Sequence, residues 1–315
     1  MSKAKLAIAL STLSVVAIVA WAVPGFGGIA HQHVRRPETA QSAGVAPIRL
    51  RNERDGGLLA KGWINGAGPF TFAIDTGAGV SLISPRVAGQ ARLGVTKSSR
   101  PLVGGLSTSP ISSNQETQIA GLALGFRENR IFGSFKAAVV TNLPASIDGV
   151  LDPTEVFSPF GYSVDLPNRE LRVFNTTAPR LRTSDVPAGG TVVRWVRETG
   201  SHRPFVRLED GRLALLDTGS GFGLALNEGR VSGGANHRRD QNTIHDLGGG
   251  RVQSRSVEPQ TVSIGSLVLR GVPTDLLTGV APGTPIILGR RALFPFRLTF
   301  DPAAKLIAIE PTERD

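Results

Sequence analysis

The sequence predicts an all-β fold made of two related lobes. An apolar strand that ends in Asp-Thr-Gly occurs twice, within residues 72–83 and again within residues 214–226. The 315 residues include 38 Gly and 21 Pro, a content that favours many turns and short strands. Beyond the N-terminus, no long stretch shows the periodicity of an amphipathic helix. A chain of this length is also typical of two domains.

The charge balance bears on the choice of partner. Lys and Arg number 35 against 25 Asp and Glu, which gives a formal net charge of +10. The basic residues are scattered and form no stripe with interleaved aromatics, so we expect a solvated basic surface and no nucleic-acid partner. Such a surface would attract an anionic membrane or an acidic substrate. The absence of cysteine excludes disulfides and thiolate metal sites.

The first 22 residues have the pattern of an export signal. Lys3 and Lys5 precede a long apolar run, and residues 20–22 read Ala-Trp-Ala, a small-x-small cleavage pattern. The run is also long enough for an uncleaved membrane anchor. Both interpretations predict an exported protein, periplasmic or extracellular, and the second anchors it to the inner membrane.

Residues 23–45 are rich in Gly, Pro and polar residues and are predicted to form a linker. His31 and His33 form a His-x-His pair there, which could bind a metal weakly. No third ligand lies nearby in the sequence, so we expect an exposed segment and no metal site.

A first lobe is predicted over residues 46–178, where short apolar runs alternate with turns. The turn at residues 65–68 joins two strands, and the second strand delivers Asp75 to its end. The strand-like runs of this lobe are residues 58–64, 69–74, 80–83, 117–124, 137–140 and 171–174.

A connector at residues 179–190 and a second lobe at residues 191–315 complete the predicted organisation. The turn at residues 209–212 leads into the strand before Asp217, as in the approach to Asp75. The strand-like runs of this lobe are residues 192–196, 205–208, 213–216, 261–269, 273–277, 297–301 and 306–309.

The repeat extends beyond the Asp-Thr-Gly motif. A Pro-Phe pair begins at Pro159 and another at Pro295, and each is followed six residues later by an aspartate, Asp165 and Asp301. Such matched spacing is what duplication of one lobe would leave. Two lobes related by a pseudo-twofold axis would bring both Asp-Thr-Gly loops to that axis.

Asp75 and Asp217 are the candidate reactive groups. Two carboxyl groups a few ångströms apart cannot both ionise, so they share one proton. One can then act as a base on a water molecule while the other acts as an acid toward a carbonyl oxygen. This chemistry needs neither a metal nor another cofactor.

The residues after each aspartate suit a rigid, closely packed pair of loops. Thr76 and Thr218 can form hydrogen bonds with the backbone across the pair, and Gly77 and Gly219 omit a Cβ where the loops approach. The next residues differ between the two copies, Ala78 in one and Ser220 in the other. Since a hydroxyl can stabilise an ionised carboxylate, we expect Asp217 to be the more readily ionised partner. A single Asp-Thr-Gly, by contrast, would be read as a plain turn with an Asx-type hydrogen bond.

The two motifs, Asp75-Thr76-Gly77-Ala78 and Asp217-Thr218-Gly219-Ser220, resemble those of the aspartic proteases of the pepsin and retropepsin superfamily. The resemblance covers most of residues 47–313. It implies two acid-protease-like β-barrel lobes with a substrate cleft between them. It also implies an aspartic endopeptidase whose dyad activates water to hydrolyse a peptide or protein substrate. With both lobes in one chain, the resemblance implies a monomer with an internal pseudo-dimer.

The resemblance also points to further residues. A glycine-containing hairpin closes over the substrate as a flap in this family. The candidates here are Gly104 and Gly105 in the first lobe and Gly248 and Gly249 in the second, although glycines also mark plain turns. The family's apolar-apolar-Gly motif behind the active-site loop is matched by Ile287-Leu288-Gly289. The first lobe has Val150-Leu151-Asp152 instead, which puts the packing behind Asp75 in question.

Two other functions compete with the endopeptidase. A catalytically weak or inactive peptide-binding or scaffolding protein on the same fold is favoured by the departure at Asp152, because a fold does not determine activity. A membrane-tethered basic adaptor rests only on the N-terminus and the charge. The sequence has no nucleophile-elbow pattern of a Ser-His-Asp enzyme, and its glycine-rich turns lack the Lys-Ser/Thr ending of a phosphate loop.

Overall fold

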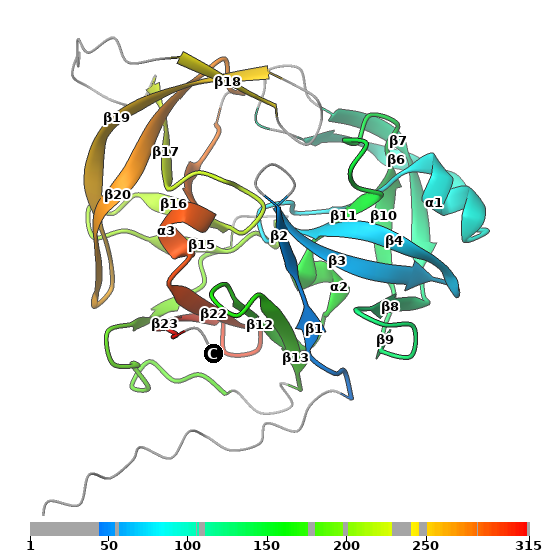
Figure 1. Ribbon diagram of the computed structural model, residues 1–315, viewed down its shortest axis with the longest axis horizontal. Helices are drawn as coiled ribbons and strands as arrows, with labels where there is room; N and C mark the ends of the chain where they lie inside the picture. The colour runs from blue at the N-terminus through cyan, green and yellow to red at the C-terminus, as the bar shows by residue number, and fades with distance from the viewer. Residues whose placement is uncertain are drawn as a thin grey trace, which may run out of the picture. The chain divides into compact units, whose positions relative to one another are not determined.

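The structure is a computed structural model, drawn in Figure 1. It describes residues 44–53, 57–104, 106, 111–175, 180–197, 201–228, 241–245, 251–281 and 283–313. The predicted signal peptide or anchor, His31, His33 and three candidate flap glycines (Gly105, Gly248 and Gly249) lie outside these residues. Within the part that is described, none of the helices has the length and apolar character needed to cross a bilayer.

The strands of the first lobe form one curled sheet, which we call the first-lobe sheet. Its order is β6-β7-β10-β5-β11-β4-β3-β8-β9, and β2 pairs with β3 at the side. The strands are β2 (Arg51–Glu53), β3 (Gly57–Ile64), β4 (Ala67–Ile74), β5 (Ser81–Ile83), β6 (Val95–Gly104), β7 (Ile111–Ile119), β8 (Leu122–Leu124), β9 (Arg130–Ile131), β10 (Phe135–Val139) and β11 (Gly149–Leu151).

The second lobe has its own sheet, the second-lobe sheet, in the order β15-β16-β21-β17-β20-β19-β18. The strands are β15 (Phe205–Arg207), β16 (Leu213–Asp217), β17 (Leu224–Asn227), β18 (Gln241–His245), β19 (Arg251–Ile264), β20 (Leu267–Thr278) and β21 (Ile286–Gly289). Both Asp-Thr-Gly loops therefore follow a strand that has a neighbour on each side, β4 in the first sheet and β16 in the second.

The two sheets repeat one strand order. From β7 the first-lobe sheet runs β7-β10-β5-β11-β4-β3, and the second-lobe sheet runs β19-β20-β17-β21-β16-β15. In both, the strand before Asp-Thr-Gly pairs in parallel with β11 or β21, and the strand after the loop pairs antiparallel with that same central strand. The predicted all-β fold of two related lobes is confirmed.

A third sheet, the shared sheet, takes strands from both halves of the chain. Its order is β1-β13-β12-β22-β23-β14, and β12 and β22 lie side by side in Figure 1. The strands are β1 (Ile48–Arg49), β12 (Gly161–Asp165), β13 (Glu170–Phe174), β14 (Thr191–Arg194), β22 (Phe296–Asp301) and β23 (Leu306–Pro311). Backbone hydrogen bonds between β12 and β22 thus join the two lobes directly.

Buried aromatic rings reinforce this junction. Tyr162 on β12 is the register partner of Phe300 on β22, and their rings stack with centroids 4.6 Å apart. The Trp195 ring meets Phe300 edge-on at 5.8 Å. Such pairs stabilise a core beyond the area they bury.

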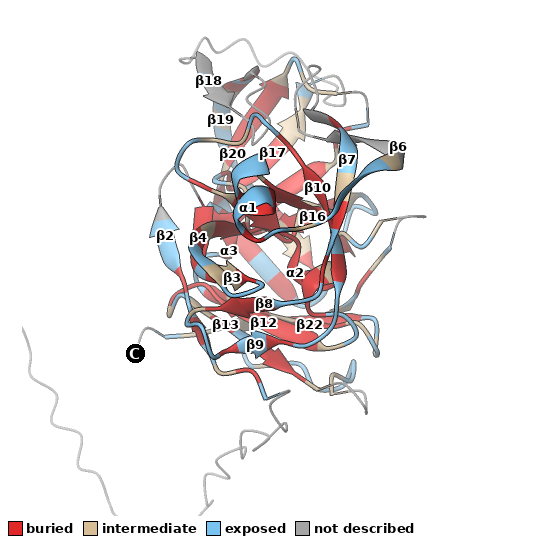
Figure 2. Ribbon diagram, turned by 90° about the vertical axis from the view of Figure 1, so that its right-hand side faces the viewer, coloured by how far each residue is buried: buried red, intermediate tan, exposed pale blue. Residues whose placement is uncertain are grey.

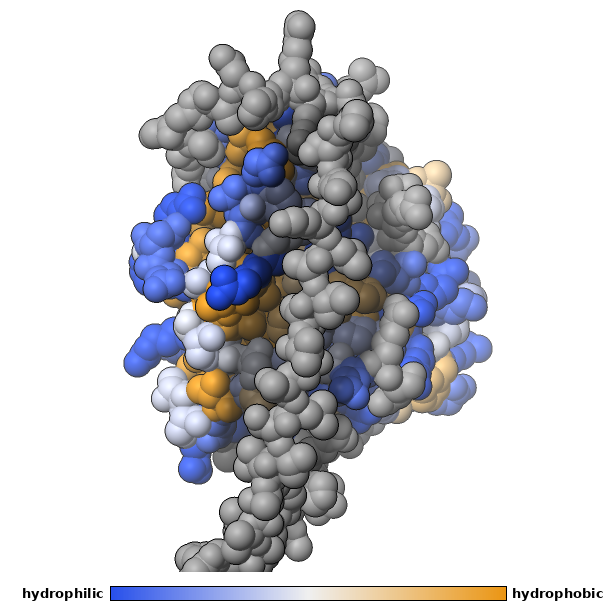
Figure 3. Space-filling view, turned by 60° about the vertical axis from the view of Figure 1, so that its left-hand side comes forward, coloured by the Kyte–Doolittle hydropathy of each residue, from blue (hydrophilic) through white to orange (hydrophobic). Residues whose placement is uncertain are grey.

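In Figure 2 the buried residues fill the interior of the sheets, while exposed residues lie at loops and outer strands. Figure 3 shows one face on which hydrophobic residues gather between hydrophilic ones.

Two predicted strands are interrupted by turns at glycines. Residues 117–124 split into β7 and β8 because Gly121 lies against Asn65; its carbonyl accepts a hydrogen bond of 2.7 Å from the Asn65 N–H. A Cβ at Gly121 would be 2.8 Å from Asn65 Oδ1. Residues 261–269 split into β19 and β20 at Gly265, whose φ of +55° lies in the left-handed region that favours glycine.

The described residues also contain three short helices that the sequence interpretation omitted. They are α1 (Pro85–Gln90), α2 (Pro153–Val156) and α3 (Arg290–Leu293). The first two begin with a capping side chain followed by proline: Ser84 accepts from Val87 N–H, and Asp152 accepts from Thr154 N–H. A capping residue followed by proline was the local signal available for these helices.

Candidate active site

Each candidate aspartate lies at the end of a strand that is held on both sides by hydrogen-bonded neighbours. Leu151 on β11 is the register partner of Ile74 on β4, and Leu151 O then accepts a hydrogen bond of 3.0 Å from Asp75 N–H. In the second lobe, Asp217 itself is the register partner of Gly289 on β21. The backbone before each carboxyl group is therefore fixed by parallel pairing.

The structure brings the two loops into direct contact. A Cβ placed on Gly77 would lie 2.6 Å from Asp217 Cγ, and one placed on Gly219 would lie 2.3 Å from Asp75 Cγ. Each carboxyl group thus lies against the glycine of the opposite loop, where any side chain would collide with it. Asp75 is 6% exposed, and Asp217 is partly exposed.

Thr76 and Thr218 link the loops through four hydrogen bonds. The Thr76 hydroxyl donates to Leu216 O at 2.7 Å and accepts from Thr218 N–H at 3.0 Å. The Thr218 hydroxyl donates to Ile74 O at 3.2 Å and accepts from Thr76 N–H at 3.2 Å. Both threonines are fully buried, so water cannot replace these bonds. Each lobe therefore holds the aspartate-bearing strand of the other.

The carboxyl groups also accept hydrogen bonds from their own loops. Asp75 Oδ1 accepts from Gly77 N–H at 2.8 Å, and Asp217 Oδ1 accepts from Ser220 N–H at 2.9 Å. The Ser220 hydroxyl oxygen instead accepts from Phe222 N–H at 3.3 Å. Ser220 therefore stabilises the Asp217 carboxylate through its backbone rather than through the hydroxyl that the sequence interpretation invoked.

Ala78 has a packing role in the first loop. It lies against a buried apolar cluster formed by Leu59, Ala73, Leu82, Ala138, Val140, Ile147 and Val150. A small apolar residue suits this position because the loop rests directly on the cluster.

The environment shifts the pKa of both carboxyl groups in the same direction but to different extents. Burial raises the pKa of Asp75 well above its usual range, and the charge of Asp217 and the hydrogen bond between the two side chains raise it further. Burial also raises the pKa of Asp217, but the hydrogen bond with Asp75, the backbone N–H groups of Ser220 and Gly219 and the charge of Arg290 oppose that rise. Burial and the proximity of the two carboxyl groups therefore favour one proton shared by the pair.

Arg290 is a residue of the site that the sequence interpretation missed. It begins α3 directly after Gly289, and only 8% of it is exposed. Its Nη1 donates to Thr218 O at 3.0 Å and to Gly219 O at 2.8 Å. The guanidinium thus supports the second Asp-Thr-Gly loop from behind. The sequence does show an arginine directly after an apolar strand and a glycine. Its bonding partner Gly219 lies 71 residues away in the sequence, so the contact could not be predicted from local pattern.

Asp152, the departure noted in the first lobe, is fully buried at the corresponding place. Its Oδ1 caps α2 by accepting from Thr154 N–H at 2.9 Å. Its Oδ2 is buried with no hydrogen-bond partner among the residues that the structure describes. Burial raises the pKa of Asp152 to about 7.

The candidate flap of the first lobe is the hairpin of β6 and β7. Gly104 ends β6 and is the register partner of Ile111, and Gly105 lies outside the described residues. Leu106, the one described residue between β6 and β7, accepts a hydrogen bond of 2.9 Å from Ala281 N–H of the second lobe. It also packs against an apolar cluster of the second lobe formed by Phe222, Ala225, Val252, Leu277 and Ile287.

The hairpin of β18 and β19 occupies the equivalent place in the second lobe. Gly248 and Gly249 lie between these two strands in the sequence, outside the described residues. Across the described ranges, no group of three or more His, Cys, Asp or Glu side chains is placed to hold a metal ion.

Comparison with known families agrees with this geometry. Residues 60–151 match the family model described as aspartyl protease. The match begins within β3 and ends with β11, so it includes the Asp75 loop. A search of curated proteins gave no match for this chain. The family match over residues 60–151 and the all-β fold together support an aspartyl protease of the retropepsin and pepsin kind.

Proposed function

We propose that this chain is an aspartic endopeptidase that hydrolyses peptide bonds with Asp75 and Asp217. The observation that carries the proposal is the mutual contact of the two loops, in which each carboxyl group lies against the glycine of the other loop. Two buried carboxyl groups so placed share one proton, which equips them for simultaneous acid and base catalysis. The aspartyl protease family match supports the same reaction class.

The reaction follows from the protonation of the pair. The ionised carboxylate accepts a proton from a water molecule, whose oxygen forms a bond to the carbonyl carbon of the scissile peptide. The protonated carboxyl group donates its proton to the carbonyl oxygen, and a neutral tetrahedral diol results. The proton taken from water then passes to the amide nitrogen as the C–N bond breaks, and one hydroxyl of the diol returns its proton to the other carboxylate. An acid and an amine result, and the dyad regains its single proton.

Rigid loops serve this mechanism because both proton transfers depend on short, aligned distances. The buried hydrogen bonds of Thr76 and Thr218 hold the two carboxyl groups in register before substrate binds. A misplacement of about 1 Å can lower a rate about 100-fold. The substrate we propose is an extended peptide or a protein segment, which can pair with strand edges in the manner of an added strand.

The test is cleavage of a diverse peptide pool between pH 3 and pH 8. We expect Asp75→Asn and Asp217→Asn each to lower cleavage about 1,000-fold or more, because each removes one of the two proton-transfer groups. The matched control is Asp210→Asn, which makes the same chemical change at an exposed turn. A statine-type inhibitor should block the wild type and the control alike.

Other outcomes would change the interpretation. Loss of cleavage in only one aspartate variant would mean that the two loops do not form one site. The alternative is a peptide-binding or scaffolding protein on the same fold, and the buried Asp152 behind Asp75 is the observation that favours it. Folded wild type that binds peptides but cleaves none of them would establish that alternative.

A further inference from the structure

Different residues follow the central strand behind the two loops of the dyad, and the registers make Asp152 equivalent to Gly289 and Pro153 equivalent to Arg290. The central strand β11 runs through Leu151 into Asp152 and Pro153, and the central strand β21 runs through Leu288 into Gly289 and Arg290. The registers define the equivalence, because Leu151 pairs with Ile74 and Leu288 pairs with Leu216, each directly before its aspartate. A buried acid therefore stands behind one aspartate and a buried base behind the other.

Arg290 supplies the positive charge on the side of Asp217. Its guanidinium donates to the carbonyl oxygens of Thr218 and Gly219, the two residues that follow Asp217. Both acceptors are neutral, so the charge of Arg290 is not neutralised by them. Its side chain is packed under the loop, where the low dielectric strengthens its effect on the nearest carboxylates.

Asp152 supplies the opposite influence on the side of Asp75. Its carboxyl group is fully buried, and its Oδ2 has no partner in the described part of the chain. Thr154 and Tyr162 lie next to it and bond each other through their hydroxyls at 2.8 Å. Above a pH of about 7, where Asp152 ionises, its charge disfavours a second negative charge on Asp75 and so makes Asp75 easier to protonate.

We propose that Arg290 and Asp152, placed behind opposite loops, reinforce a division of roles within the dyad. Asp75 holds the shared proton and donates it to the substrate carbonyl oxygen, and Asp217 is the carboxylate that takes a proton from water. Arg290 and Asp152 are positioning residues that act through the aspartates. The assignment rests on the proposed endopeptidase function.

Several other charged groups lie around the two aspartates. Asp75 faces Asp217 and Asp152, and Asp217 faces Asp75 and Arg290. Burial is the main cause of the raised pKa of Asp152, and the charge of Glu155 adds to it. One layer further out, Lys136 acts on Glu155 and Arg197 acts on Tyr162, each with a positive charge. The hydrogen bond between the two side chains and the backbone donors contribute most to the asymmetry between the aspartates, and the charges of Arg290 and Asp152 add to it in the same direction.

The first test compares pH profiles of kcat/KM. In Arg290→Gln, Asp217 loses its positive neighbour and its pKa rises, so the acidic limb should move up by about 1 pH unit. In Asp152→Asn, Asp75 loses a negative neighbour and its pKa falls, so the basic limb should move down while the acidic limb stays in place. Arg291→Gln changes an exposed arginine of the same helix and should leave both limbs unchanged.

The second test needs no activity. Carboxyl ¹³C titration by NMR would follow Asp75 in Asp217→Asn and Asp217 in Asp75→Asn, because each variant leaves one member of the pair. We expect the higher pKa for Asp75, and adding Arg290→Gln should narrow the gap by about 1 pH unit. Equal values, or a higher value for Asp217, would overturn the assignment.

The two tests also distinguish the effect of the Arg290 charge from the structural support that Arg290 gives to the second loop. Arg290→Lys keeps the charge but changes the length and shape of the side chain that donates from Nη1 to both carbonyls, so it should keep the acidic limb of wild type even where kcat falls. If Arg290→Gln lowers kcat and moves neither limb, Arg290 only supports the loop and the proposal is wrong. If wild type cleaves nothing, the proposed function fails, while the NMR gap still decides the asymmetry. Should Arg290→Gln not fold, the Arg290→Lys and Asp152→Asn titrations carry the test.

Discussion

In the first lobe the central strand ends at Leu151 and is followed by Asp152 and Pro153, whereas in the second lobe it ends at Gly289 and is followed by Arg290. The strands around these residues are otherwise arranged alike, with the same order and the same parallel and antiparallel pairings. The difference lies in how closely the loop packs behind each aspartate. A Cβ on Gly289 would be 2.6 Å from Phe222 O and 3.0 Å from Ser220 O, so the second lobe requires glycine there.

The first lobe has room for a whole side chain at that point. Asp152 N–H donates to the Ser81 hydroxyl at 3.2 Å, and its carboxyl group turns away to cap α2. The departure from apolar-apolar-Gly therefore exchanges a tight backbone contact for a helix cap. Two lobes with one backbone plan can thus place opposite charges behind the two aspartates without disturbing the loops themselves.

The largest effect should come from the glycines at the contact between the loops. Gly219→Ala would put a Cβ 2.3 Å from Asp75 Cγ, and Gly77→Ala would put one 2.6 Å from Asp217 Cγ. Either change must push a carboxyl group away, so we expect kcat/KM to fall about 100-fold or more, with Gly219→Ala the worse. Gly89→Ala, in α1 with open space around it, is the control and should cleave peptides like wild type. Near-normal cleavage by Gly219→Ala would contradict the described contact.

The buried acid of the first lobe should make stability depend on pH. The folded state raises the pKa of Asp152 from 3.8 to about 7, so the native protein binds this proton more tightly than the unfolded chain does. Stability is then lost as pH rises from about 4 to about 7, by up to about 4 kcal/mol from this group alone. Asp152→Asn cannot ionise, so its unfolding free energy should fall less over that range.

Urea unfolding at several pH values measures this difference. Asp185→Asn, an exposed position, is the matched control and should follow wild type. Because burial also raises the pKa of Asp75 and of Asp217, some loss of stability with rising pH should remain in Asp152→Asn. Identical curves for Asp152→Asn and wild type would show that Asp152 is not a buried acid in solution.

The comparison of the lobes also shows which features the sequence could predict. The strands around Asp75 and Asp217 were predictable because apolar runs and turn residues are local signals. The helices were not, since four to six residues are too few for a periodic pattern. The support given by Arg290 depends on a contact that only the folded chain creates. The unpartnered oxygen of Asp152 also depends on burial, although the departure at that position was visible in the sequence.

A smaller difference should separate the two threonines. Thr76→Val leaves Leu216 O and Thr218 N–H without their bonds of 2.7 and 3.0 Å, whereas Thr218→Val removes two bonds of 3.2 Å. We expect each change to cost about 1–3 kcal/mol, with Thr76→Val the more costly because its bonds are shorter. Thermal unfolding measures the difference, and Thr96→Val, at an exposed strand position, is the control. A larger loss in Thr218→Val would reverse the proposed ranking.

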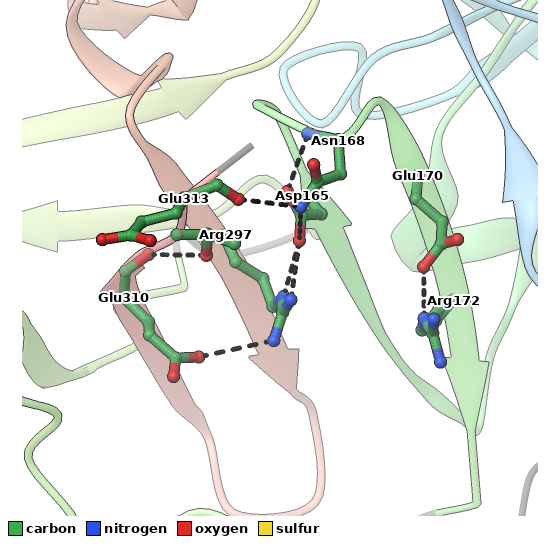
Figure 4. Close-up of polar contacts among 8 residues, drawn as sticks. Asp165, Asn168, Glu170, Arg172, Arg297, Glu310 and Glu313 are labelled. Atoms are coloured by element: carbon green, nitrogen blue, oxygen red, sulfur yellow. Dashed lines mark hydrogen bonds and ion pairs between the residues drawn. The ribbon is translucent and has the colours of Figure 1, made fainter. Parts of the chain in front are cut away.

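The smallest effect concerns the ion pair that joins the lobes in the shared sheet. Arg297 on β22 donates through Nε and Nη2 to Asp165 Oδ2 on β12, at 3.0 and 2.7 Å (Figure 4). Asp165 is buried, so removing its partner leaves a poorly compensated charge. We expect Arg297→Gln to cost about 1–2 kcal/mol in urea unfolding.

The matched control is Arg172→Gln, which removes an ion pair to Glu170 within the single strand β13. The Arg172 side chain is 62% exposed, and pairs of this kind contribute about 0–1 kcal/mol. Arg297→Gln should therefore destabilise the protein more than Arg172→Gln, and the gap should persist at high salt because the Asp165 side chain is shielded from water. Equal losses would mean that the junction between the lobes depends on the β12–β22 backbone bonds and the Tyr162–Phe300 stack rather than on this ion pair.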